Sequence, residues 1–159
     1  MLKKYLTVFF ISMVPIVELR GAIPIAHAMG LPTITSYVLA IIGNMIPVPF
    51  IYFFARKLLE WMSRQSSVIG KAGRWLLQKG ERGGNKIKEK AGKNGVFLAL
   101  LLFVGIPLPG TGAWTGTLAA SILELDFRTS VAACMGGVLL AGLIMSSGSR
   151  IVMLIMGLF

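Results

Sequence analysis

Charged residues are scarce in this chain of 159 residues, and that scarcity excludes most classes of soluble protein. Only 14% of the residues are Asp, Glu, Lys or Arg, and just six of these are acidic. About 25% of residues are charged in an ordinary soluble domain. Apolar residues make up 55% of the chain and occur in long blocks. The composition therefore predicts one integral membrane domain over residues 1–159.

Histidine and cysteine are also nearly absent, since each occurs once, as His27 and Cys134. One of each is too few for a metal cluster, and a single cysteine cannot form an intrachain disulfide. The sequence has no Gly-rich phosphate-binding motif of the P-loop type and no spacing typical of a nucleophile with its His and carboxylate. We therefore expect no metal, no cofactor and no enzymatic activity.

The positive charge is concentrated in one stretch of the chain. Eleven Lys and Arg but only three Glu lie between residues 56 and 93, so this stretch carries +8 of the net charge of +10. It is flanked by apolar blocks, which is typical of a cytoplasmic loop in a multi-pass protein of a bacterial-type inner membrane. This position argues against nucleic-acid binding. Helical spacing of apolar residues, together with Trp61 and Trp75, predicts an amphipathic segment over 56–94 that lies on anionic inner-leaflet headgroups.

Two apolar blocks, 5–31 and 95–123, are interrupted by proline and glycine near their middles. As unbroken helices they would measure about 40 Å, which exceeds the ~30 Å hydrocarbon core of a bilayer. Because proline removes a helical hydrogen bond, we expect each block to form a hairpin of two half-helices. The break in the first block is predicted at residues 18–21.

Each predicted hairpin is followed by one apolar run long enough to span a membrane, 33–55 and 129–147. The fold class is therefore all-α integral membrane, with an inverted repeat of a re-entrant broken hairpin plus a transmembrane helix. Secondary transporters often have this plan, with discontinuous helices near the bilayer midplane. The alternative is four full spans with both termini inside, which Lys3 and Lys4 favour under the positive-inside rule.

Two polar stretches inside the hairpins are the candidate functional elements. A charge within an apolar segment costs about 2.5–3.5 kcal/mol, so Glu18 and Arg20 require a function or a structural partner. Residues 107–116, rich in Pro and Gly, leave backbone groups unpaired, and these either bind an anion at a helix N-terminus or form a tight turn. The predicted substrate and proton pathway comprises Glu18, Arg20, Gly21, Pro24, Pro107, Pro109, Gly110, Gly112 and Trp114, with Asn44 and Arg150 as secondary candidates.

The stretches Glu18-Leu-Arg-Gly-Ala-Ile-Pro24 and Pro107-Leu-Pro-Gly-Thr-Gly-Ala-Trp-Thr-Gly116 resemble the signatures of the small multidrug export protein family, and the resemblance covers nearly the whole chain. That family is distantly similar to the DedA/VTT superfamily. The likeness implies two re-entrant hairpins, each followed by a membrane helix, and a role in moving lipids across bilayers. The second motif departs from the DedA pattern, because Thr111 and Gly112 stand where an arginine often follows Pro-Gly.

Three hypotheses of function follow. The first is a small transporter or lipid translocator, acting as a homodimer on an anionic or amphipathic substrate, with Glu18 coupling proton movement and Arg20 holding an anionic headgroup with the amides of the second hairpin. The second is an exporter of cationic drugs, which predicts an aromatic-lined cavity with an acidic residue, and Glu18 is the one acid inside the apolar blocks. The third is a membrane assembly factor without transport activity.

Overall fold

The computed structural model of the chain describes residues 1–155, and the side chains of all of these except Arg150, Met153 and Leu154. All regular structure in this part of the chain is helical. The helices are α1 (Leu2–Met13), α2 (Glu18–Ala28), α3 (Thr33–Met45), α4 (Pro47–Ser63), α5 (Val68–Gly105), α6 (Ala113–Ile122) and α7 (Phe127–Ile155).

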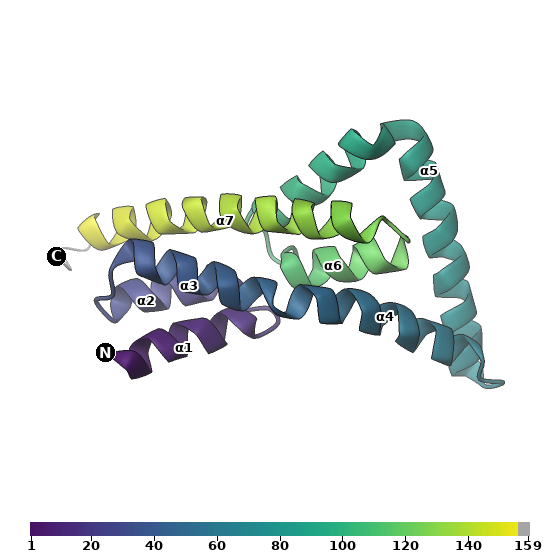
Figure 1. Cartoon of the computed structure of the whole chain (residues 1–159), viewed down its shortest axis with the longest axis horizontal. Coiled ribbons are helices and arrows are strands. Elements are labelled where there is room, and N and C mark those ends of the chain that lie inside the picture. The colour runs from purple at the N-terminus through teal and green to yellow at the C-terminus, as the bar shows by residue number, and fades with distance from the viewer. Residues whose placement is uncertain (156–159) are drawn as a thin grey trace.

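Two hairpins enter the molecule from opposite ends (Figure 1). The α1–α2 hairpin comes from the end that holds the N-terminus, and its turn lies near the middle of the molecule. The hairpin formed by the last part of α5 and by α6 comes from the other end, and its turn also lies near the middle. Helices α3 and α4 run the full length in one direction, and α7 runs back beside them.

The first hairpin breaks one turn earlier than the sequence predicted. Helix α1 ends at Met13 and α2 begins at Glu18, so residues 18–21 form the first turn of α2 and not the break. Pro15 stands in the break, and the neighbouring Ile16 has a φ of 75°. A positive φ at a β-branched residue is strained by about 1–3 kcal/mol. Pro24 is tolerated inside α2, where it forfeits only one helical hydrogen bond.

Proline also interrupts the first long helix, as its sequence indicates. Helix α3 ends at Met45 and α4 begins at Pro47, yet the two continue along one line (Figure 1). Helix α4 extends to Ser63, which is beyond the end of the apolar run at Ala55. The predicted basic segment 56–94 is therefore divided between the end of α4, a short loop and the beginning of α5.

Helix α5 consists of two arms that meet at Gly92, whose φ of 61° and ψ of −177° are not helical. The first arm, residues 68–91, lies across the end of the bundle, and the second arm, residues 93–105, returns toward its middle (Figure 1). The first arm carries seven of the eleven Lys and Arg residues between residues 56 and 93.

The first arm of α5 contacts the α6–α7 corner through glycines that allow backbones to touch. A Cβ atom placed on Gly80 would lie 2.0 Å from the Ile122 carbonyl oxygen, and one on Gly84 would lie 1.8 Å from that of Leu123. Real atoms cannot approach so closely, so only glycine permits this packing. The arm is thereby fixed against the corner that leads into α7.

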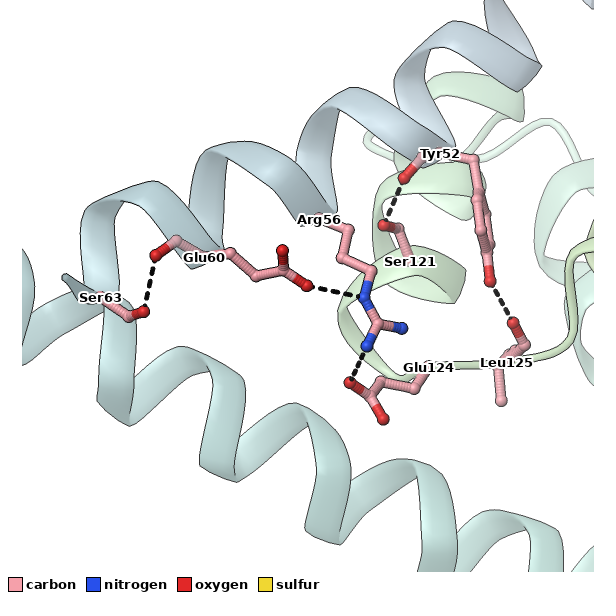
Figure 2. Close-up of polar contacts among 7 residues, drawn as sticks. All are labelled: Tyr52, Arg56, Glu60, Ser63, Ser121, Glu124 and Leu125. Carbon is pink, nitrogen blue, oxygen red and sulfur yellow. Dashed lines mark hydrogen bonds and ion pairs between the residues drawn. The ribbon is translucent and has the colours of Figure 1, made fainter.

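A polar cluster joins α4 to the same corner (Figure 2). The Ser121 hydroxyl donates to the Tyr52 carbonyl oxygen at 2.7 Å, and the Tyr52 hydroxyl donates to the Leu125 carbonyl oxygen. Arg56 pairs with Glu124 at 3.1 Å on the surface. Exposed ion pairs contribute about 0–1 kcal/mol, so the buried hydroxyl bonds are the stronger restraint on the corner.

The outside of the helical bundle is apolar, as expected for a surface in contact with lipid. Phe50 is 72% exposed and Phe54 66% exposed, and a soluble protein rarely exposes so much contiguous apolar surface. Two helical stretches, Thr33–Ser63 and Phe127–Ser149, are long and apolar enough to cross a membrane. Helices α1, α2 and α6 have 12, 11 and 10 residues, so each is about 15–18 Å long and reaches about half of a ~30 Å core.

Replacing Gly84 by alanine is expected to lower the free energy of unfolding by about 1–3 kcal/mol, because the added methyl group meets a backbone carbonyl that cannot rotate away. The measurement is the thermal unfolding midpoint of the purified protein in detergent. Gly83→Ala is the matched control, since its Cβ would meet only the end of the Leu123 side chain at 3.1 Å. Equal midpoints for the two variants would contradict the packing described.

Candidate functional site

The Glu18 carboxylate binds the N-terminus of a helix almost a hundred residues away in sequence. Glu18 is 4% exposed and lies at the start of α2. One of its oxygens accepts a hydrogen bond from the Trp114 amide at 2.9 Å, and the other accepts one from the Ala113 amide at 3.2 Å. These are the first two amides of α6, so the carboxylate interacts with the positive end of the helix dipole.

The Arg20 guanidinium binds the opposite side of the same turn. One of its terminal nitrogens donates to the carbonyl oxygens of Leu108 and Thr111, both at 2.8 Å. The other donates to those of Val104 at 2.9 Å and Ile106 at 3.2 Å. These carbonyls belong to the end of α5 and the loop that follows, where helical hydrogen bonding stops. A planar fork of donors suits this arrangement better than a lysine ammonium would.

The second hairpin also donates a hydrogen bond to the first. The Trp114 indole N–H donates to the Met13 carbonyl oxygen at the end of α1, at 3.2 Å. Within the second turn, the Thr111 hydroxyl lies 3.0 Å from the Ile106 carbonyl oxygen and 2.9 Å from that of Leu108. The two turns therefore satisfy each other's free backbone groups, as buried polar groups in an apolar environment require.

Gly112 makes the contact between the hairpins possible. Its φ is 142°, and a Cβ atom at this position would lie 2.2 Å from a carboxylate oxygen of Glu18. Gly110, with a φ of 79°, allows the turn that precedes it. The Pro-Gly-Thr-Gly motif is thus shaped to receive the carboxylate from α2.

A cavity of about 450 Å³ lies between the two turns. Its walls come from three parts of the chain: the break after α1 with the start of α2, the α5–α6 turn with the first residues of α6, and the side of α7. Its lining includes Pro15, Ile16, Glu18, Arg20, Pro107, Pro109, Gly110, Thr111, Trp114 and Met145.

The cavity brings together six of the predicted pathway residues, and Gly112 lies against Glu18 beside it. The other predictions fall elsewhere. Gly21 and Pro24 lie in α2 but do not line this cavity. Asn44 is buried near the end of α3, where its Oδ1 accepts no hydrogen bond from the described residues. The side chain of Arg150 lies outside the described residues.

The structure adds a contact at the predicted anion site that the sequence did not indicate. The amides at the start of α6 were expected to bind an anionic headgroup together with Arg20, but they are occupied by Glu18. Arg20 is likewise engaged by four carbonyl oxygens. The sequence could not reveal this, because the helix N-terminus and the carboxylate that binds it lie in different hairpins.

Sequence reasoning missed seven of the residues that line the cavity: Pro15, Ile16, Leu108, Thr111, Thr115, Leu118 and Met145. Thr111 is part of the Pro-Gly-Thr-Gly motif, and its hydroxyl between two glycines is a signal that could have drawn attention to it. Ile16 and Met145 carry no such signal, because apolar side chains in an apolar block do not reveal where the chain turns. Among the described residues, no three His, Cys, Asp or Glu lie together as metal ligands would.

The apolar exterior, the two candidate spans and the buried charges at broken helices define a helical membrane protein. A family model described as "Putative small multi-drug export protein" matches residues 18–144, and the chain belongs to this family. The match begins at Glu18 and includes both motifs of the site. Comparisons with curated proteins and with solved structures found no match.

Replacing Arg20 by lysine is expected to lower the free energy of unfolding by about 2 kcal/mol or more. A lysine ammonium has three donors on one atom and cannot serve four carbonyl oxygens spread along the turn. Chemical or thermal unfolding in detergent measures the change. The exposed Arg128→Lys is the control, and a similar cost at both positions would refute the role given to Arg20.

Proposed function

We propose that the chain is a small membrane transporter of an anionic or amphipathic substrate, with the cavity between the hairpin turns as its substrate site. The observation that carries the proposal is the position of Glu18. An ionisable carboxylate is held on the amides of a broken helix, beside a cavity of about 450 Å³. Ionisable groups at such positions in membrane proteins commonly mark substrate or proton pathways.

The contacts of Glu18 suggest how a proton and an anion would be coupled. As a carboxylate, Glu18 is itself the anion at the α6 N-terminus. A protonated carboxyl group is neutral and interacts more weakly with these amides and with the helix dipole. Protonation would therefore free the amides of Ala113 and Trp114 for an anionic substrate group. A proton and an anion would then be carried in the same direction, while Arg20 keeps the turn in shape.

The lengths of the half-helices support a re-entrant arrangement. Helices α1, α2 and α6 are each about half as long as a bilayer core is thick. Both hairpins would reach the midplane from opposite sides and turn back, and the two halves of the chain would form an inverted repeat. With the basic first arm of α5 on the cytoplasmic side of an inner membrane, the N-terminus lies outside.

Export of cationic drugs is the second candidate, and the description of the family favours it. A cationic substrate needs a free acidic group and aromatic walls. Trp114 supplies an aromatic ring, but Glu18 is the one acidic residue lining the described cavity, and it is already bound to two amides. The geometry therefore fits an anionic substrate better.

Transport can be tested in liposomes that contain fluorescently labelled phosphatidylglycerol, with dithionite quenching to report its movement between leaflets. Wild-type protein is expected to accelerate movement, more so at acidic pH. Glu18→Gln, a neutral mimic of the protonated carboxyl, is expected to abolish the pH dependence, because it would leave the amides available to the substrate at every pH. Glu81→Gln, an exposed change on α5, is the control.

Full activity and an unchanged pH profile in Glu18→Gln would reject the coupling role of this residue. Acceleration of ethidium efflux with no lipid movement would favour drug export. An absence of movement of either probe, in protein shown to be folded, would favour a role without transport.

The membrane arrangement predicts opposite sidedness for the two ends of the bundle. After Cys134→Ala, single cysteines placed at Lys3 and at Lys86 can be labelled in intact cells with a membrane-impermeant maleimide. Lys3→Cys is expected to react from outside, and Lys86→Cys only after permeabilisation. Labelling of both positions from the same side would instead indicate four full spans.

A further inference from the structure

We propose that the bend of α5 forms a binding site for one anionic phospholipid, with its phosphate on Lys88 and Lys93 and an acyl chain along the second arm. This site lies at the basic end of the molecule and not at the hairpin turns. It is therefore separate from the proposed transport cavity, and a lipid could bind there whether or not the protein transports a substrate.

A cavity of about 400 Å³ lies beside the bend at Gly92. Both arms of α5 contribute to it, and so does the α6–α7 corner. Lys88 and Lys93 stand on either side of Gly92 and line the cavity, as do Glu124 and Asp126. Figure 1 shows that the bend stands away from α6 and α7.

The charges in this cavity are less balanced than their numbers suggest. Glu124 is already paired with Arg56 at 3.1 Å. Asp126 accepts two hydrogen bonds from Thr129, one from its amide and one from its hydroxyl, both at 2.9 Å. These bonds hold the pKa of Asp126 below its usual range, as expected for a carboxylate that caps a helix.

Neither ammonium group forms an ion pair among the described residues, although the charge of Lys93 also contributes to lowering the pKa of Asp126. Lys88 donates to the backbone carbonyl of Glu124 at 2.7 Å, which does not neutralise its charge. Lys93 forms no ion pair within the described part of the chain. Asp126 keeps its negative charge, whereas the charge of Glu124 is offset by Arg56, so the cavity carries a net positive charge that suits a phosphate group.

An apolar cavity of about 180 Å³ adjoins the charged one, because Val96 and Leu125 line both. It lies between the second arm of α5 and α6, and its walls include Ala99 and Phe103. A free phosphate would gain nothing from contact with this apolar surface, whereas an acyl chain would bury it. The combination of a net positive pocket with an adjoining apolar groove therefore favours a lipid as the occupant.

Binding can be measured by native mass spectrometry of the full-length protein, delipidated in detergent and titrated with phosphatidylglycerol. We expect saturable binding of one lipid molecule. Lys93→Ala and the double variant Lys88→Ala/Lys93→Ala should weaken it progressively, with the double variant at least about tenfold weaker. Lys86→Ala/Lys90→Ala removes the same charge from residues that do not line the cavity and should change the affinity little.

The apolar part of the site is tested separately with Ala99→Leu. Ala99 is exposed and lines the groove, so a larger side chain would fill the groove without entering the core. This variant should weaken binding of phosphatidylglycerol while its unfolding midpoint stays unchanged. Lys88→Arg, which keeps both the charge and a donor toward Glu124, should bind as the wild type does.

Three results would overturn the proposal. The first is an equal loss of affinity in the two double-lysine variants, which would indicate only general attraction to a basic surface. The second is equally tight binding of phosphatidylcholine. The third is full displacement of the lipid by inorganic phosphate with no effect of Ala99→Leu, which would indicate a phosphate site and not a lipid site.

Discussion

The contact between Glu18 and the first amides of α6 is the constraint on which the centre of this protein depends. A carboxylate buried in an apolar environment is stable only where donors replace the water it has lost. The broken second hairpin provides two such donors at 2.9 and 3.2 Å. In turn, the amides at the start of α6 need an acceptor, and the first hairpin provides it. Each hairpin thus supplies the hydrogen-bond partners that offset the desolvation of polar groups in the other.

Arg20 makes the corresponding contacts at the other end of the turn between α5 and α6. Its four hydrogen bonds reach carbonyls from Val104 to Thr111, where α5 ends and no helical partner follows. A charge pair two residues apart in sequence therefore serves the two ends of one turn, a carboxylate on the amides and a guanidinium on the carbonyls. The carboxylate lies at the positive N-terminal end of α6 and the guanidinium at the negative C-terminal end of α5, as the helix dipoles favour. The strained positive φ angles of Ile16 and Glu18 are located where the two hairpins meet, as expected for a preorganised site.

The two ends of the molecule have different chemistry. One end holds the N-terminus and the α2–α3 connection, whereas the other carries the basic first arm of α5, held close by glycines against the α6–α7 corner. The outer surface between these two ends is apolar. The molecule therefore has one polar site near its middle and one basic surface at one end. The two proposals concern these two places, which share none of their lining residues.

The sequence alone was enough to establish the class of protein and the position of most helix breaks. The low charge content, the apolar blocks and the prolines predict a helical membrane protein with two broken hairpins, because these properties depend on composition and local geometry. The interruptions before Pro47 and after Gly105 lie beside prolines and glycines that are visible in the sequence. The first break was misplaced by one turn, since Glu18 and Arg20 looked like loop residues when nothing showed what they bind.

Only the tertiary structure decided what the two charged residues do. Sequence reasoning placed Glu18 and Arg20 in one functional unit with the second motif, but it assigned the α6 amides to a substrate anion. The amides are in fact bound to Glu18, a residue more than ninety positions earlier. Such a contact leaves no trace in local periodicity, because it arises when two separate hairpins meet. The same reason explains why Met145 of α7 could be recognised as part of the cavity only in the folded chain.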